Sequence, residues 1–167
     1  MKAIVNVTPD WGIGSENSLL VRIHADMQRF RALTSDHTII IGRKTLATFP
    51  NAKPLPHREN IILTHDPAFS AEPAIICHDI DELRTVLFGR DPESIFVCGG
   101  EQIYRLLLPY CTVALVTLTE TDLKPDRYFP NLNQLPNWIL THEDEPKKEG
   151  DLTYRFLTYQ NTKPLSL

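Results

Sequence analysis

Thr38-Ile39-Ile40-Ile41-Gly42-Arg43-Lys44-Thr45 holds a strand pattern followed directly by a helix start. The short β-branched run at 38–41 predicts a strand, and Gly42 predicts the turn that ends it. The residues at 44–49 then predict one helical stretch, stopped by Pro50. This order of strand, glycine and helix is typical of an α/β sheet with parallel strands.

A second stretch repeats this order. Ile95-Phe96-Val97-Cys98 predicts a strand, Gly99-Gly100 a turn, and the residues at 101–108 a helix stopped by Pro109. In an open α/β sheet, ligands bind at the carboxyl ends of strands, and helix N-termini attract phosphate. The two strand-to-helix junctions together therefore predict a ligand with several phosphates, such as a dinucleotide.

At the first strand-to-helix junction, Arg43 and Lys44 would add positive charge and Thr45 a hydroxyl group. Each signal is weak alone, because a glycine ends many parallel strands for steric reasons. Neither stretch matches G-x-G-x-x-G or G-x-x-x-x-G-K-[ST], so neither common nucleotide-binding fingerprint is present.

The rest of the chain continues the alternation. We expect further strands at 3–7, 60–64, 74–77 and 113–119, and further helices at 24–34 and 79–88. Segments 138–142 and 153–158 predict an antiparallel pair at one side of the largely parallel sheet. We expect a mobile turn at 10–14, where Gly permits positive φ, and a proline-containing loop at 51–58.

Composition places the chain in a broad class without naming a function. The 167 residues suggest one domain, at 1–160, with a short tail at 161–167. The net charge of −4 disfavours a nucleic-acid binder, and no apolar run has the length of about 18 residues that a membrane helix needs. Three cysteines without a C-x-x-C pair, and no signal peptide, predict a cytoplasmic protein with free thiols.

Charge is unevenly distributed. Residues 1–66 hold eight basic and six acidic residues (8 − 6 = +2), whereas residues 120–151 hold four basic and eight acidic residues (4 − 8 = −4). An anionic ligand would therefore favour the first segment. Uneven charge on a solvated surface is the alternative explanation.

The helix expected at 24–34 carries the candidate catalytic group. At about 100° per residue, Asp26 falls on the apolar face of this helix. That face is formed by Ile23, Met27, Phe30 and Leu33. A carboxylate among apolar side chains must be paired, protonated or used, since burying a lone charge is costly. Alternatively, Asp26 lies half exposed in the first turn, where the helix dipole favours it.

Other catalytic patterns are missing from the sequence. It contains neither H-E-x-x-H nor G-x-S-x-G, and its six histidines are scattered. We therefore expect no metal site.

A set of short motifs follows in order along nearly the whole chain: Ile13-Gly14-x-x-Asn17, Asp26-Met27-x-x-Phe30, Gly42-Arg43-Lys44-Thr45, Arg58-Glu59-Asn60-Ile61-Ile62-Leu63-Thr64, Cys98-Gly99-Gly100-x-x-Ile103-Tyr104, Thr117, and Asp126-Arg127-Tyr128-Phe129-Pro130. The ordered set resembles the dihydrofolate reductases of the bacterial chromosomal type, which are antifolate targets. The resemblance implies a single-domain α/β fold, an eight-stranded, mostly parallel mixed sheet flanked by four helices. It also implies NADPH-dependent reduction of 7,8-dihydrofolate to tetrahydrofolate, in one-carbon and thymidylate metabolism.

The same resemblance assigns residues to the substrate. Asp26 would hydrogen-bond the pterin ring and promote protonation of the ring nitrogen beside the carbon that accepts the hydride. Arg58 would grip the glutamate α-carboxylate of the folate, and Thr117 would support Asp26. The other substrate-binding residues implied are Ile4, Val5, Met27, Phe30, Phe49, Leu55 and Cys98.

For NADPH, the resemblance implies contacts of Lys44 and Thr45 with phosphates and of Arg43 near the 2′-phosphate. Residues 9–20 would form a loop that closes over the site. The other cofactor-binding residues implied are Asn6, Ile13, Gly14, Leu19, Gly42, Leu63, Thr64, His65, Gly99, Gly100, Gln102, Ile103 and Tyr104. The partners implied are small molecules, with no nucleic acid or membrane, and the protein would be a monomer.

The sequence departs from the family pattern in several places. Leu20-Val21 stands where Pro-Trp is common, and His24 where Pro is common. Val21 cannot make the hydrogen bond by which the tryptophan positions a water, so the resemblance does not assign the proton route. His65 replaces a common serine or arginine, and Glu101 follows the glycine pair where a third glycine is found in some members.

Two alternatives remain at this point. One is a pterin- or pyrimidine-type reductase of the same fold, such as the reductase of riboflavin synthesis, which lacks the Asp26 helix motif and an Arg58 equivalent. The other is a non-catalytic nucleotide-binding module, in which loss of Asp26 would have no consequence.

Overall fold

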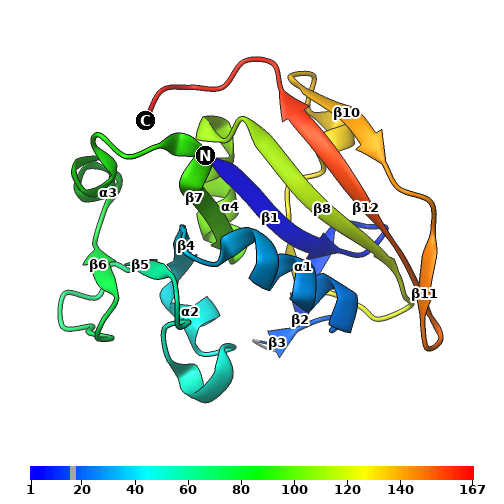
Figure 1. Ribbon diagram of the computed structural model, residues 1–167, viewed down its shortest axis with the longest axis horizontal. Coiled ribbons are helices and arrows are strands. Elements are labelled where there is room, and N and C mark those ends of the chain that lie inside the picture. The colour runs from blue at the N-terminus through cyan, green and yellow to red at the C-terminus, as the bar shows by residue number, and fades with distance from the viewer. Residues whose placement is uncertain (16–17) are drawn as a thin grey trace.

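One mixed sheet forms the centre of the molecule. The computed structural model describes residues 1–15 and 18–167. Eight strands are arranged in the order β10-β12-β8-β1-β7-β4-β5-β6, and β11 pairs with β12 as a ninth strand (Figure 1). Their bounds are β1 Lys2–Val7, β4 Thr38–Gly42, β5 Glu59–Leu63, β6 Ile75–Cys77, β7 Ile95–Gly99, β8 Val113–Glu120, β10 Trp138–Glu143, β11 Lys147–Glu149 and β12 Leu152–Asn161.

Most of the sheet is parallel. β1 pairs in parallel with β7 and β8, β4 with β5 and β7, and β5 with β6. β12 runs antiparallel to both β8 and β10, so the antiparallel strands lie together at one side. The predicted mostly parallel mixed sheet, with its late antiparallel pair, is confirmed.

Four α-helices cover the two faces of the sheet in the described part of the chain: α1 His24–Thr34, α2 Arg43–Leu46, α3 Ile80–Leu87 and α4 Glu101–Leu107. β4 shows why both faces are covered, because Ile39, Ile40 and Ile41 are all fully buried. Ile39 belongs to the core cluster that packs against α1, and Ile40 to the larger cluster that includes α3 and α4. In Figure 1, α1 lies in front of β1 and α4 behind the sheet.

The segment around Gly12 differs from the expected turn. Gly12–Ser15 is a strand, β2, which pairs with β3 (Ser18–Leu19) and β9 (Arg127–Tyr128) in a second, three-stranded sheet. The positive φ of 65° falls on Trp11 rather than on a glycine. Gly12 is required by packing, since a Cβ there would lie 2.3 Å from Pro125. The expected turn is confined to 8–11, where the Trp11 N–H donates to the Thr8 carbonyl at 2.8 Å, and the prediction of a turn was wrong for 12–14. Asn17, the last residue of the first motif, and Glu16 in the predicted closing loop lie outside the described residues.

The helix after β4 is also shorter than expected. α2 ends at Leu46, and a separate 3-10 turn at Pro50–Ala52 follows. The prediction of one helix over 44–49 was therefore wrong. By contrast, the Asp79 cap is confirmed, since its carboxylate accepts hydrogen bonds from the backbone N–H groups of Asp81 and Glu82.

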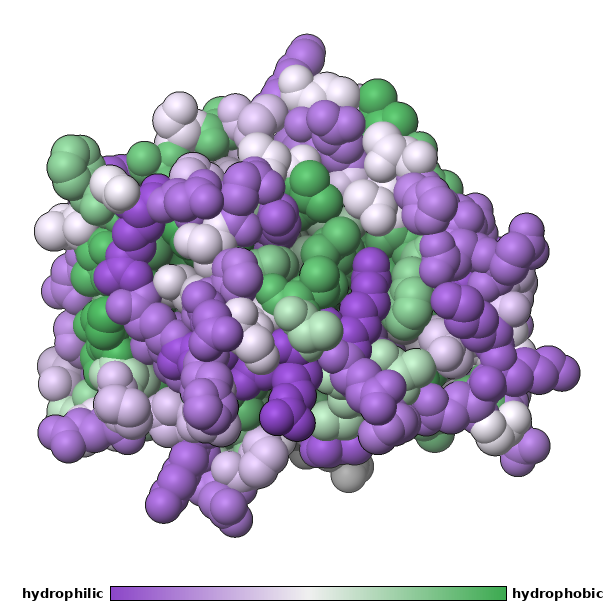
Figure 2. Space-filling model, in the orientation of Figure 1, coloured by the Kyte–Doolittle hydropathy of each residue, from purple (hydrophilic) through white to green (hydrophobic). Residues whose placement is uncertain are grey.

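The last residues have no regular secondary structure. The backbone N–H of Leu165 donates to the Pro109 carbonyl, and Leu167 packs against the large core cluster. Within the described residues, we find no helix with the length and apolar character needed to cross a membrane. The face that carries α1 is largely hydrophilic, with apolar side chains visible near its middle (Figure 2).

Candidate active site

Asp26 lies in the first turn of α1, and hydrogen bonds hold both of its carboxylate oxygens. The Thr117 hydroxyl donates to Oδ1 at 2.5 Å, and the Asn6 amide donates to Oδ2 at 3.2 Å. Thr117 is a buried residue of β8, and Asn6 is its register partner on β1. Asp26 is partly buried and reaches the main cleft. Asp26 therefore meets both expectations, since it lies half-buried in the first helical turn and its carboxylate is hydrogen-bonded at the edge of a cavity.

A further residue completes this cluster. The hydroxyl of Thr119, which is 0% exposed, donates to Asn6 Oδ1 at 2.8 Å. Thr119 was missed by the sequence analysis. Its signal was the period of two along β8, which places Thr119 on the same face as Thr117.

The cleft beside Asp26 has a volume of about 1680 Å³. One small ligand usually occupies roughly 300–1,000 Å³, so this cleft is large enough for two. Every predicted site residue lines it except two, Thr117 and Gly99. Thr117 lies behind Asp26, while Gly99 is buried at the end of β7. The structure thus brings the predicted residues to one place.

Apolar side chains form one wall of the cleft. Phe30, Phe49, Leu55 and Cys98 pack against the core cluster centred on Ile39. Met27, although expected on the apolar face of α1, is 48% exposed and faces the cleft. Val5 and Ile4 reach the cleft from β1.

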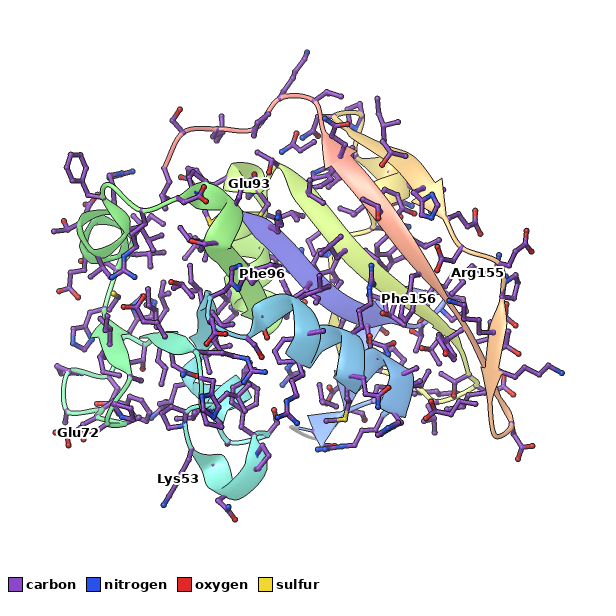
Figure 3. The ribbon with its side chains drawn as sticks, in the orientation of Figure 1. Lys53, Glu72, Glu93, Phe96, Arg155 and Phe156 are labelled. Atoms are coloured by element: carbon purple, nitrogen blue, oxygen red, sulfur yellow. The ribbon has the colours of Figure 1, made fainter. Side chains whose placement is uncertain are left out.

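Arg29 lies elsewhere on α1. Its guanidinium stacks 4.2 Å from the centre of the Phe156 ring, which Figure 3 shows beside α1. Burial lowers the pKa of Arg29.

Arg58 is held at the edge of the cleft. Its Nε donates to the Thr34 hydroxyl and its Nη1 to the Pro56 carbonyl, both at 2.8 Å. Its guanidinium lies 5.7 Å from the centre of the Phe30 ring. Burial lowers the pKa of Arg58, but a guanidinium stays charged in a protein. Lys53, on the same loop, points away from the body of the molecule (Figure 3).

Thr34 is another residue that the sequence analysis missed. It is buried at the end of α1, where its hydroxyl donates to the Phe30 carbonyl at 2.7 Å while it accepts from Arg58. The helix that carries Asp26 therefore also fixes Arg58.

Basic and polar groups line the far part of the cleft. Arg43, Lys44 and Thr45 begin α2, and Thr64 and His65 follow β5. Arg43 is paired at 3.1 Å with Asp66, an acidic neighbour that the sequence analysis did not single out. His78 also lines this part, with Nδ1 2.9 Å from the Thr64 carbonyl.

The Gly99-Gly100 pair lies where β7 meets α4. Gly99 has a φ of +108°, and a Cβ there would approach the Tyr104 ring to 2.9 Å. The Tyr104 hydroxyl donates to the Ile4 carbonyl at 2.7 Å, which ties α4 to β1. Glu101, at the start of α4, forms an ion pair with Arg105 at 3.0 Å.

Comparisons with known proteins agree with this geometry. The family model described as "Dihydrofolate reductase" matches residues 1–161. A dihydrofolate reductase of Bacillus subtilis (strain 168) is 32% identical over 150 residues, covering 89% of this chain and 86% of the relative. One from Staphylococcus haemolyticus is 37% identical over 121 residues, covering 72% and 70%.

The chain belongs to the dihydrofolate reductase family. A solved structure shares its fold with a TM-score of 0.84 at 24% identity, and covers 96% of this chain and 95% of its own. It is a dihydrofolate reductase from Enterococcus faecalis complexed with NADP(H) and RAB-propyl. The predicted family and fold are therefore confirmed, and the alternative reductase family is set aside. The ligand contacts of individual residues stay predictions.

Proposed function

We propose that this chain reduces dihydrofolate to tetrahydrofolate with NADPH, as an enzyme of folate metabolism. The observation that carries the proposal is the Asp26 carboxylate, held by two donors at the edge of a cleft large enough for two ligands. Membership of the dihydrofolate reductase family supports it.

The residues present fit NADPH. Arg43 and Lys44 supply positive charge at the cleft, and Thr45 supplies a hydroxyl group suited to phosphate. A Cβ on Gly100 would lie 3.2 Å from Thr45 Oγ1, so the backbone there leaves room that another residue would fill. NADPH, when bound, supplies the hydride. We propose Lys44 and Thr45 as its phosphate contacts, with the pair Gly99 and Gly100 beside it.

Asp26 would orient the pterin ring. An ionised carboxylate offers about four lone-pair sites, of which Thr117 and Asn6 use two. The remaining sites can accept hydrogen bonds from ring N–H groups in the cleft. The negative charge would stabilise a proton on the ring nitrogen beside the carbon that accepts the hydride.

The other substrate contacts follow from the cleft walls. Phe30, Phe49 and Leu55 would pack against the flat rings of the substrate, which excludes water around the reacting carbon. Arg58 would hold the folate α-carboxylate with the fork geometry that a guanidinium provides.

We also propose that the protein acts as a monomer in the cytoplasm. One chain supplies the whole cleft, and Cys77, Cys98 and Cys111 are free thiols. Arg43 favours NADPH over NADH through its charge, although its pairing with Asp66 weakens that preference.

The test measures NADPH oxidation with and without dihydrofolate for the wild type and for Asp26→Asn. We expect dihydrofolate-dependent oxidation that the substitution lowers by about 100-fold or more at neutral pH, a range typical of lost acid–base assistance. Lower pH, which protonates the substrate beforehand, should restore part of the rate. Asp81→Asn, an exposed change on α3, serves as the matched control.

Each outcome has a definite meaning. Folded wild-type protein without dihydrofolate-dependent oxidation overturns the proposed function. If the protein binds NADPH but never oxidises it, the chain is the non-catalytic nucleotide-binding module. Equal rates for the wild type and Asp26→Asn overturn only the role given to Asp26.

A further inference from the structure

We propose that Asn6 and Thr119 together position the Asp26 carboxylate for the reaction, with Asn6 as the positioning residue and Thr119 as the group that orients it. The inference rests on the proposed function. It assigns Asn6 to the substrate side of the reaction, whereas the family resemblance implied a cofactor contact.

The sheet register places these side chains on one face. Asn6 on β1 is the Cα partner of Thr117 on β8, and Thr119 follows two residues later. Because side chains alternate along a strand, all three point to the face that α1 covers. Ile4 and Leu115, two residues earlier on each strand, pack in the same core cluster as the α1 side chains.

Thr119 holds the Asn6 amide in the orientation that the carboxylate selects. The Asp26 carboxylate only accepts hydrogen bonds, so the amide nitrogen faces Oδ2 at 3.2 Å, and the Thr119 hydroxyl donates to Asn6 Oδ1 at 2.8 Å on the other side. Thr119 is fully buried, and without this partner the Asn6 amide could rotate. A rotated amide would direct an oxygen lone pair at the carboxylate, which is repulsive.

The consequence for Asp26 is a fixed carboxylate plane. Thr117 alone would hold one oxygen and leave the group free to rotate about χ2, which is a broad torsion in aspartate. A second donor on the other oxygen removes that freedom. The remaining lone pairs then face the cleft in one orientation, which favours the geometry in which the substrate reacts.

The first test compares Asn6→Ala with the wild type in single-turnover hydride transfer and in steady state. A hydrogen bond to a charged group contributes enough that its loss should slow hydride transfer by about tenfold. The KM values for dihydrofolate and NADPH should stay within about threefold, because binding keeps its other contacts. Thermal unfolding and dihydrofolate binding without NADPH check that the variant is folded.

The second test isolates the orientation of the amide. Thr119→Val removes the hydroxyl at nearly constant volume and should slow hydride transfer, whereas Thr119→Ser keeps the hydroxyl and should restore the rate. In the Asn6→Ala background, Thr119→Val should have no further effect, since Thr119 acts through Asn6. Thr112→Val removes a hydroxyl that donates to the Met1 carbonyl before β8 begins, and should leave hydride transfer unchanged.

Three results overturn the inference. One is unchanged hydride transfer in Asn6→Ala, and another is a rise in the NADPH KM alone, which makes Asn6 a cofactor contact. The third is equal rates for Thr119→Val and Thr119→Ser, which decides the question even if Asn6→Ala does not fold. Wild-type protein without dihydrofolate-dependent oxidation is a different failure, because it removes the proposed function itself.

Discussion

The carboxylate of Glu149 caps the helix that carries Asp26, through the backbone N–H of His24 at 2.6 Å. Its second oxygen accepts from the N–H of Ala25 at 3.1 Å, and β11 supplies this cap from 125 residues along the chain. Ile23, the residue in the N-cap position, makes no side-chain cap. The cap needs a backbone N–H at position 24, which His24 supplies and a proline would lack.

Glu149→Gln should therefore weaken the start of α1. Glutamine is neutral and has only one side-chain oxygen, so the helix N-terminus loses a negative charge and one of its two hydrogen-bond acceptors. The thermal midpoint should therefore fall by a few degrees. Differential scanning calorimetry measures the change. Glu145→Gln removes an exposed carboxylate from the connection before β11 and is the matched control. Equal midpoints for the two variants would contradict the cap.

The same cap predicts a pH dependence. Hydrogen bonds from the backbone N–H of His24, and to a smaller extent from that of Ala25, favour the ionised carboxylate. They lower the pKa of Glu149. A group with a lowered folded-state pKa stabilises fully above its unfolded value and loses that effect as pH falls through the folded value. The difference in midpoint between the wild type and Glu149→Gln should therefore be present at neutral pH and shrink in acid. A difference that grows in acid would rule this explanation out.

Much of the fold follows from local sequence patterns. The isoleucine run in β4 and the segment at Ile95 each predicted a strand. In the structure both are central strands, which agrees with their apolar residues at successive positions. α1 was predicted with its observed bounds, whereas β2 was missed. Gly12 and Gly14 are typical of turns, and their strand pairing depends on β9, more than 100 residues away in sequence.

Site residues that belong to a sequence motif could be predicted, whereas residues that act only through a partner on another helix or strand could not. Helix periodicity placed Asp26 on the apolar face of α1 and left its role open, and all but two of the residues that the resemblance implied line the cleft. Thr34, Thr119 and Glu149 act through partners on other elements, and no local pattern marks a threonine or glutamate as such a partner. Sheet register places Thr119, the β11–β12 hairpin places Glu149, and the end of α1 places Thr34.

The three thiols should react slowly in the native protein. Burial raises the pKa of Cys77 to about 11 and that of Cys111 to about 12, and burial also raises the pKa of Cys98. The thiolate is the reactive form, so labelling by a disulfide reagent at pH 8 should be slow and should rise about tenfold per pH unit. Denatured protein is the control, in which all three should react fast. Rapid labelling of the native protein at pH 8 would contradict these environments.

Gly99→Ala should destabilise the protein more than Gly89→Ala. Both glycines have positive φ, at +108° and +76°, so both substitutions introduce backbone strain. A Cβ on Gly99 also approaches the Tyr104 ring to 2.9 Å, whereas at Gly89 nothing lies within 4 Å. We expect a loss in the free energy of unfolding of about 2–4 kcal/mol for the first and about 1 kcal/mol for the second. Urea denaturation measures both, and equal losses would exclude the contact with Tyr104.

Arg58→Leu should raise the KM for dihydrofolate by about 10- to 100-fold with little change in kcat, since a charge-assisted contact is lost equally from the bound substrate and the transition state. Thr34→Val removes the acceptor of Arg58 Nε and should raise the same KM by about threefold to tenfold. Arg58→Lys keeps the charge but loses the forked pair of guanidinium donors, so its KM should lie nearer to that of Arg58→Leu than to the wild type.

Thr85→Val, which removes an exposed hydroxyl on α3, is the control for the threonine substitution. If Arg58→Leu changed only the KM for NADPH, Arg58 would be a cofactor contact. If Thr34→Val left the KM for dihydrofolate unchanged, the Pro56 carbonyl alone would hold the guanidinium.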